Sequence, residues 1–426
     1  MADALGNSLL IIILPLYIAD QPSLWLDLPT EAQVGLVISL YGFLFAFAQP
    51  FAGALTDRVG RRKPFILTGL ALMTLATLGF MFAHRYVWIV VLRCLQGLGV
   101  AMIIPSVLAL ISAVTEKRTR GNAMGVYSTL RMIGFATGPL LAGALQVYFG
   151  YDAAFMAGAA FLVVAYLLVQ FTVHERTGPA AAADREGDPA FGEEGGTGEK
   201  DGGRDGEEGE RGLPGAGRVA DPTERFGVSR MPTSTNLALM FSTVVMASSL
   251  SMISALENEF NERLAQTALG FGVAFSALTV ARLFVQIPLG RLSDRIGRKK
   301  LIVGGLVVLA PLTVLFAYVS TTLQLVGVRL AQGVASAAIA APAFALAADL
   351  ARKGGEGREM SFVTMGFGLG LGFGPLIAGA LGGYVGFEAP FLVVGVLSLA
   401  SALVVAVWAE ESIKPHEWSL SEDPNP

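Results

Sequence analysis

The sequence predicts an all-α membrane protein with twelve transmembrane helices in two pseudo-symmetric six-helix bundles. First, 53% of the 426 residues are hydrophobic and only 15% are charged, whereas soluble domains carry about 25% charged residues. Second, the stretches 64–83, 301–319 and 389–409 contain no charged side chain, and about 20 apolar residues in a helix cross the ~30 Å hydrocarbon core of a bilayer. Third, the motifs of the first half of the chain return in the second half.

Charge clusters and Gly/Pro positions separate the predicted spans. We expect helices rather than strands because, in hydrocarbon, the backbone polar groups of a helix are satisfied within its own segment. The predicted spans of the first half are 1–19, 33–56, 64–83, 86–113, 120–148 and 153–173. Those of the second half are 236–258, 266–290, 301–320, 323–349, 358–381 and 387–409.

The repeat is visible at several separate places. Arg93, Gln96 and Gly97 are followed 236 positions later by the same three residue types, starting at Arg329. The segment GFATGPLLAGAL that begins at residue 134 returns as GLGFGPLIAGAL, again 236 positions later. Because six spans per half is an even number, both halves cross the membrane in the same direction, with the pseudo-twofold axis along the membrane normal.

Residues 174–235 have a different composition, dominated by Gly, Glu, Asp and Arg. Such a segment cannot bury enough apolar surface to offset its conformational entropy, so we predict a disordered linker. The predicted domains are a six-helix bundle at 1–173, the linker at 174–235, a second bundle at 236–411 and a tail at 412–426.

The distribution of Lys and Arg predicts the orientation, because these residues accumulate in short cytoplasmic connections. The connections on the other side of the membrane contain only two basic residues, Arg85 and Arg263. We therefore predict a multi-pass protein of the cell membrane with both termini and the linker in the cytoplasm. The basic connections contain Arg58, Arg61, Arg62, Lys63, Lys117, Arg118, Arg120, Arg295, Arg298, Lys299, Lys300, Arg352, Lys353 and Arg358.

One charged phrase occurs twice, as GALTDRVGRRKP from residue 53 and as GRLSDRIGRKKL from residue 290. This phrase resembles a signature of the major facilitator superfamily in the loop between the second and third helices of each half. The Gly-Pro segment after residue 134 resembles a motif of drug:proton antiporters. Asp3 followed by Pro15 resembles the first helix of tetracycline/proton antiporters. The resemblance covers both halves and implies proton-coupled efflux of small molecules by alternating access.

The repeated charged phrase can also be interpreted from its charges and its place at the end of a predicted helix. Asp57 ends the second predicted helix, where the helix dipole disfavours a negative charge, so it needs a cation or a helix N-terminus from elsewhere. The resemblance implies a latch between the halves in the outward-open state. We expect Asp57 near 358–361 and Asp294 near 120–123. The predicted latch residues are Asp57, Arg58, Arg61, Arg62, Asp294, Arg295 and Arg298.

Charges inside the spans are costly, about 2.5–3.5 kcal/mol each on insertion scales, and tend to be paired and functional. Arg93 and Arg329 occur in both halves, which favours a shared architectural role, although the resemblance ties Arg93 to proton coupling. Asp3 is the carboxyl that the resemblance assigns to proton binding. Glu257 and Glu259 are the alternative acids, for which a solvated end of the seventh helix is the preferred interpretation.

Arg131 and Arg282 have no repeat partner, since the equivalent positions are Phe367 and Phe45. This asymmetry favours a role in the transport path over packing onto a carbonyl or the lipid interface. If both face a central cavity, they favour anionic or carboxylate-bearing substrates. The predicted cavity residues are Asn7, Gln49, Arg131, Arg282 and Gln286. Small residues let helices approach closely in lipid, and the predicted packing or hinge positions are Gly134, Gly138, Pro139, Gly374 and Pro375.

The sequence also bears on other classes of function. A proton symporter or facilitator that imports a sugar or an organic anion is the alternative transporter. No Lys is followed by Ser or Thr, so a Gly-Lys-Ser/Thr P-loop is absent and an ATP-driven pump is disfavoured. A receptor without turnover would not need the duplicated phrase. We expect no enzyme, no metal and no cofactor, with the proton gradient as energy source. The expected partners are a small-molecule substrate, protons and the lipid bilayer, with no nucleic acid, and the expected state is a monomer.

Overall fold

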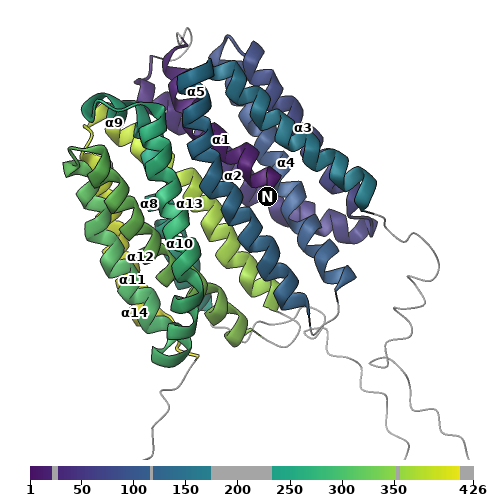
Figure 1. The fold of residues 1–426 in the computed structure, drawn as a ribbon. Coiled ribbons are helices and arrows are strands. Elements are labelled where there is room, and N and C mark those ends of the chain that lie inside the picture. Colours follow the sequence, from purple (N-terminus) through teal and green to yellow (C-terminus); the bar gives the residue numbers. More distant parts are fainter. Residues whose placement is uncertain (22–26, 116–118, 174–232, 352–355, 413–426) are drawn as a thin grey trace, which may run out of the picture. The chain divides into compact units, whose positions relative to one another are not determined.

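The computed structural model describes residues 1–21, 27–115, 119–173, 233–351 and 356–412 as helices joined by short connections (Figure 1). Most of the predicted linker and of the predicted tail lies outside the described residues. The first half contains α1 (Ala2–Ala19), α2 (Thr30–Val59), α3 (Lys63–Gly79), the short η1 (Phe80–Phe82), α4 (Tyr86–Val114) and α5 (Arg120–Thr172).

The second half repeats this order. The first of its predicted spans is made of three consecutive helical segments, α8 (Thr233–Ser251), η2 (Met252–Leu256) and α9 (Glu257–Arg263). The remaining elements are α10 (Ala268–Ile296), α11 (Arg298–Leu315), η3 (Phe316–Tyr318), α12 (Thr322–Leu350), α13 (Glu356–Tyr384) and α14 (Ala389–Trp408).

The long helix α5 supplies two membrane crossings. Gly150 interrupts it with φ 81° and ψ −177°, a conformation that glycine adopts without a steric cost. Gly134 lies against the start of α1 at Met1 and Leu5, while Leu162 lies against Gly6 of the same helix. Two positions on either side of Gly150 thus contact one short part of α1, so the chain folds back at this glycine.

The predicted all-α membrane fold is confirmed. Ten helical segments among the described residues are long and apolar enough to cross a membrane, one of which is the folded-back segment Ala123–Thr172. The shorter apolar helix Asp3–Ala19 precedes them. Counting α5 twice, and α1 once, the described chain supplies the twelve predicted crossings.

The two halves pack together mainly at one end of the helices. We call the end where α2 and α10 finish, near Arg58 and Arg298, the basic end. At the opposite end one apolar cluster contains fully buried residues of both halves, including Ile13, Val34 and Phe391. Toward the basic end each half has its own separate apolar cluster. Among the described residues, the halves therefore share a buried apolar cluster only at the end opposite the basic loops.

Glycines permit the close crossings between the halves. A Cβ on Gly42 of α2 would meet the backbone of Gly372 in α13, and one on Gly272 of α10 would meet the carbonyl of Pro139 in α5. Of the other positions predicted for packing, Gly134 and Gly138 face α1, Gly374 faces the Ser248–Ser251 turn of α8, and the Pro375 carbonyl faces Gly35 of α2.

Replacing Gly42 by leucine is expected to lower the stability of the protein by about 1–3 kcal/mol, the usual cost of overpacking. The new side chain would meet the backbone of α13 rather than a movable side chain. Gly304→Leu is the matched control, because a Cβ there meets open space. The midpoint of thermal unfolding in detergent measures both changes, and equal midpoints for the two variants would contradict the expectation.

Candidate functional site

A cavity of about 420 Å³ lies between the two halves. Its walls come from α1, α2, α4 and α5 of the first half and from α8, η2, α10, α12 and α13 of the second. Gln49, predicted for this site, is half-buried on α2 and does not line the cavity. The predicted site residues that do line it are Asn7, Arg93, Arg131, Arg282, Gln286 and the predicted packing residue Pro139.

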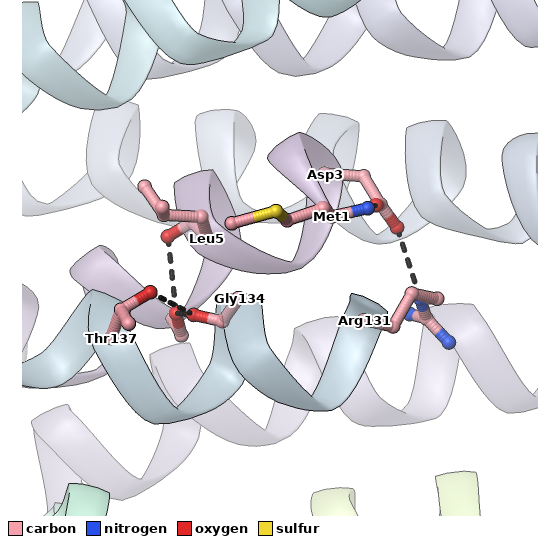
Figure 2. Close-up of polar contacts among 7 residues, drawn as sticks. Met1, Asp3, Leu5, Arg131, Gly134 and Thr137 are labelled. Carbon is pink, nitrogen blue, oxygen red and sulfur yellow. Dashed lines mark hydrogen bonds and ion pairs between the residues drawn. The ribbon is translucent and has the colours of Figure 1, made fainter. Parts of the chain in front are cut away.

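Asp3 and Arg131 form an ion pair beside the cavity. The Asp3 carboxylate accepts from Arg131 Nε at 3.2 Å, and the Met1 amine lies 3.2 Å from its other oxygen (Figure 2). Asp3 is only 8% exposed. Arg131 lies about 12 Å along its helix from Ala123, where the apolar span begins. The two charges thus lie in apolar helical segments and compensate one another.

A close crossing of α1 and α5 holds this pair in register. Ser8 Oγ lies 3.1 Å from the Leu5 carbonyl and 3.2 Å from the Gly134 carbonyl. Thr137 Oγ1 also donates to the Gly134 carbonyl, at 3.5 Å (Figure 2). The approach is possible because Gly134 and Gly138 have no Cβ atom, which would collide with α1. The small residues of the repeated Gly-Pro segment therefore position Arg131 against Asp3.

The repeated arginine of α4 is buried in a network of neutral partners. Arg93 Nη1 donates to Gln96 Oε1 at 3.0 Å and to Asn7 Oδ1 at 3.5 Å. Its guanidinium carbon lies 4.4 Å from the centroid of the Tyr41 ring, a cation–π arrangement. Gln96 in turn donates to Thr77 of α3 at 3.0 Å. The network connects four helices of the first half.

The second half contains the equivalent network with different outer partners. Arg329 Nη1 donates to Gln332 Oε1 at 2.8 Å and to the Leu250 carbonyl at 3.1 Å, and its guanidinium lies 4.2 Å from the Phe275 centroid. Gln332 donates to Ser249 Oγ at 3.0 Å. Both arginines thus connect neighbouring helices, which fits the architectural interpretation. Arg93 also lines the cavity, whereas Arg329 does not.

Arg282 of α10 is the cavity arginine whose charge is least compensated. Its Nε is buried without a hydrogen-bond partner, and so is Oε1 of Gln286 one helical turn later. The structure gives Arg282 no ion pair with any acidic group among the described residues. A buried polar atom without a partner is costly, so a polar group bound beside Arg282 and Gln286 would offset that cost.

The charged loops at the basic end form ion pairs within the second half. Arg298 lies 3.3 Å from Asp294 and 2.7 Å from Asp349 at the end of α12. Glu411 accepts from the backbone N–H groups of Arg298 and Lys299, a favourable place for an acid at a helix N-terminus. Asp294 therefore pairs inside its own half in this conformation. The side chain of Asp57 lies outside the described part, and Arg58 and Arg61 are exposed.

The alternative acids of the seventh span differ in their surroundings. Glu259 is partly exposed and pairs with Arg263 at 2.6 Å, as the solvated-end interpretation expects. For Glu257 that interpretation is wrong, because its side chain is fully buried. The neighbouring Asn258 donates to the Pro15 carbonyl of α1 at 3.0 Å, so packing of α9 against α1 removes Glu257 from water.

Sequence reasoning also missed the aromatic rings that cover the two buried arginines. Tyr41 covers Arg93 and Phe275 covers Arg329, and both rings come from other helices.

The described residues contain no group of three or more His, Cys, Asp or Glu side chains that could hold a metal ion. The chemistry of the cavity is therefore that of arginines, amides, hydroxyl groups and aromatic rings. Such groups bind and orient a ligand without transforming it, and they leave one carboxyl group, that of Asp3, beside the cavity wall.

Comparison with known proteins agrees with this arrangement. The chain is 27% identical over 363 residues to the multi-drug resistance efflux pump PmrA homolog of Lactococcus lactis, covering 84% of this chain and 80% of the relative. It is 26% identical over 397 residues to the multidrug resistance protein MdtG of Salmonella dublin, covering 93% and 90%. A bacterial homolog of the human lysosomal transporter Spinster has a similar fold, with a TM-score of 0.71 at 15% identity over 95% and 93% of the two chains.

The sequence profile of the Major Facilitator Superfamily matches residues 1–228 and 235–425. These ranges include both helical halves, the duplicated charged phrase and every residue of the cavity. Members of this family are secondary transporters rather than enzymes. The chain therefore belongs to the Major Facilitator Superfamily.

Proposed function

We propose that the protein exports small molecules through the cell membrane in exchange for protons, by alternating access at the cavity between its halves. The carboxyl of Asp3 carries the proposal, because it can bind and release a proton and lies inside the span, paired with a cavity arginine. Relatives named multidrug resistance efflux pumps or multidrug resistance proteins support the outward direction.

Proton and substrate act on the same wall of the cavity. Binding of a proton at Asp3 removes its attraction for Arg131 and changes the charge of that wall. A bound substrate changes the contacts of the same helices. Each ligand shifts the balance between the two conformations only by the difference in its affinity for them. Coupling follows when the proton and the substrate favour opposite conformations.

We place the basic end in the cytoplasm, together with both termini, because Lys and Arg accumulate in cytoplasmic connections. In this orientation the apolar cluster shared by the halves, with Ile13, Val34 and Phe391, closes the outer end. The separate clusters of the two halves lie toward the cytoplasm. The described conformation then corresponds to an inward-facing state.

Transport in proteoliposomes with an imposed pH gradient tests the proposal. We expect accumulation of a dye or drug against its gradient, in the direction opposite to proton flow, and loss of that accumulation when a protonophore collapses the gradient. Accumulation in the direction of proton flow would instead identify a symporter, which the cationic cavity would suit if the substrate is an organic anion. Movement of no compound in a chemically varied panel would overturn the transport function.

Asp57→Asn is expected to lower the transport rate of every substrate by a similar factor. The charge belongs to the predicted latch at the basic end, and its position lies 12 residues further along α2 than the cavity-lining Phe45. Asp152→Asn, at an exposed position of the opposite end, serves as the matched control and should transport normally. Initial rates for two unrelated substrates provide the measurement. A change confined to one substrate would contradict the latch and place Asp57 in substrate recognition.

A further inference from the structure

The two seams where the halves meet have different chemistry. Helix α5 packs along α10 at one seam, and α2 packs along α13 at the other. Arg131 and Arg282 line the cavity from α5 and α10, whereas Phe45 and Phe367 line it from α2 and α13. Phenylalanine rings line the cavity at both seams, since α5 and α10 also contribute Phe135 and Phe275, but of the two seams only the one between α5 and α10 presents arginines.

This division comes from a deviation of the internal repeat. Arg131 and Phe367 occupy equivalent positions of the two halves, as do Phe45 and Arg282. Each half contributes one arginine and one phenylalanine from different helices. The pairing of α5 with α10 and of α2 with α13 brings like side chains to the same seam. Since helix packing could be satisfied by identical residues in both halves, the exchange at these two pairs of positions points to ligand recognition.

The described residues that line the cavity do not balance its positive charge among themselves. None of its lining residues is acidic, while three are arginines. Asp3 compensates Arg131 at 3.2 Å, and Arg93 is held by Gln96, Asn7 and the Tyr41 ring. The Nε atoms of Arg93 and Arg282 are both buried without a partner. Arg282 differs because, among the described residues, it has no ion pair with an acid and no aromatic ring over its guanidinium.

Gln286 extends the polar site around Arg282. It lies one helical turn further along α10, lines the same cavity and has a buried Oε1 without a hydrogen-bond partner. An uncompensated charge inside the membrane span costs several kcal/mol, and a guanidinium binds a carboxylate with charge-assisted hydrogen bonds in a fork geometry. The unpartnered Oε1 of Gln286 is an acceptor, so it suits a hydroxyl or N–H group of the ligand beside the anion that Arg282 binds.

The other seam favours an apolar body. The Phe45 ring contacts Gly368, beside Phe367, so the two phenylalanine positions adjoin across α2 and α13. Phe344 and Leu371 extend the same apolar lining. Aromatic side chains prefer to stack on or abut other rings. A ligand that satisfies both seams has an anionic group at one end and an aromatic or apolar body at the other.

We propose that the substrates of this cavity are lipophilic organic anions, in which a carboxylate binds Arg282 and an aromatic body lies against Phe45 and Phe367. The proposal rests on the proposed function, since it takes the cavity as the transport site. It narrows the multidrug class to compounds with one negative charge, and it makes Arg282 the residue that determines specificity for charge.

Three ligands of nearly equal shape test this assignment by calorimetric titration of the purified protein in detergent. They are 2-naphthoate, its neutral amide and 2-naphthylmethylammonium. We expect 2-naphthoate to bind most tightly, and Arg282→Gln to weaken it about 10- to 100-fold, the range of a charge-assisted hydrogen bond. The affinities for the amide and the ammonium compound should stay unchanged or rise. Arg282→Lys should recover part of the loss, since it keeps the charge without the fork.

Two further variants separate recognition of charge from general damage. Arg291→Gln removes an exposed charge from the same helix outside the cavity and should leave all three affinities unchanged. Phe367→Leu should weaken all three ligands by a similar factor, because it alters the apolar body of the site and not its charge. Equal losses of all three ligands in Arg282→Gln, with an unchanged unfolding midpoint, would overturn the charge assignment.

Transport assays distinguish failure of this inference from failure of the proposed function. Proteoliposomes that accumulate the ammonium compound but not 2-naphthoate would leave proton-coupled export in place and overturn the anion assignment. Binding of 2-naphthoate that depends on Arg282, without gradient-driven movement of any of the three ligands, would support the binding site and contradict the export function.

Discussion

Asp3→Asn is expected to reduce gradient-driven accumulation of substrate to the level of protein-free vesicles, while exchange of substrate across the membrane continues without a gradient. Asparagine keeps the shape of the side chain and its contact with Arg131, 3.2 Å away, but it can neither bind nor release a proton. Coupling therefore fails, whereas binding and alternation of the two halves remain. Accumulation under a pH gradient and counterflow without one are measured on the same vesicles.

Asp20→Asn is the matched control for this prediction. Asp20 follows the other end of α1 and accepts from the Tyr151 hydroxyl at 2.7 Å, outside the cavity. This variant makes the same chemical change directly after the same helix, and we expect it to transport with full coupling. The double change Asp3→Asn with Arg131→Gln removes both charges and should remain uncoupled. Full accumulation in Asp3→Asn would show that another acid couples the proton, and the buried Glu257 would be examined next.

Gln332→Leu is expected to destabilise the protein by about 1.5–3 kcal/mol, the contribution of a hydrogen bond to a buried charged group. Arg329 is fully buried, and its Nε and Nη2 already lack a partner. Its Nη1 has two partners, Gln332 Oε1 at 2.8 Å and the Leu250 carbonyl. Leucine removes the first of these and also the donor that satisfies Ser249. The midpoint of thermal unfolding in detergent reports the loss.

Two variants make this expectation specific. Gln170→Leu, at an exposed position near the end of α5 where only the backbone carbonyl accepts from Lys63, should change stability by less than about 1 kcal/mol. Arg329→Met combined with Gln332→Leu should recover most of the loss, because a buried polar pair can often be replaced by apolar side chains without penalty. A double variant as unstable as Gln332→Leu alone would mean that the loss comes from packing rather than from the stranded guanidinium.

Arg329 and its counterpart Arg93 also illustrate what a repeat can predict. Their recurrence at one offset predicts a shared structural role, and both arginines indeed bind the glutamine three residues later. The rings that cover them, Tyr41 and Phe275, do not occupy equivalent positions of the repeat. Sequence spacing predicts contacts within one helix because i and i+3 share a face. It does not predict which neighbouring helix supplies a ring.

Gln49 and Glu257 show that the sequence also does not predict which way a side chain faces. Both are polar residues in or near a span, and the sequence favours a cavity position for Gln49 and a solvated end for Glu257. The structure places Gln49 outside the cavity lining and buries Glu257 completely. Which way a side chain faces depends on the rotation of its helix against its neighbours, and hydropathy carries little information about that angle.

By itself the sequence determines the helical class, the twelve crossings, the tandem halves and the family, because each follows from local hydropathy or from motifs written within one segment. Only the tertiary structure decides that Asp3 meets Arg131, that the two unmatched arginines share one seam, and that the halves join at one end. These features depend on the crossing and rotation of helices distant in the chain. Their energies come from pairs of residues that the sequence leaves more than 100 positions apart.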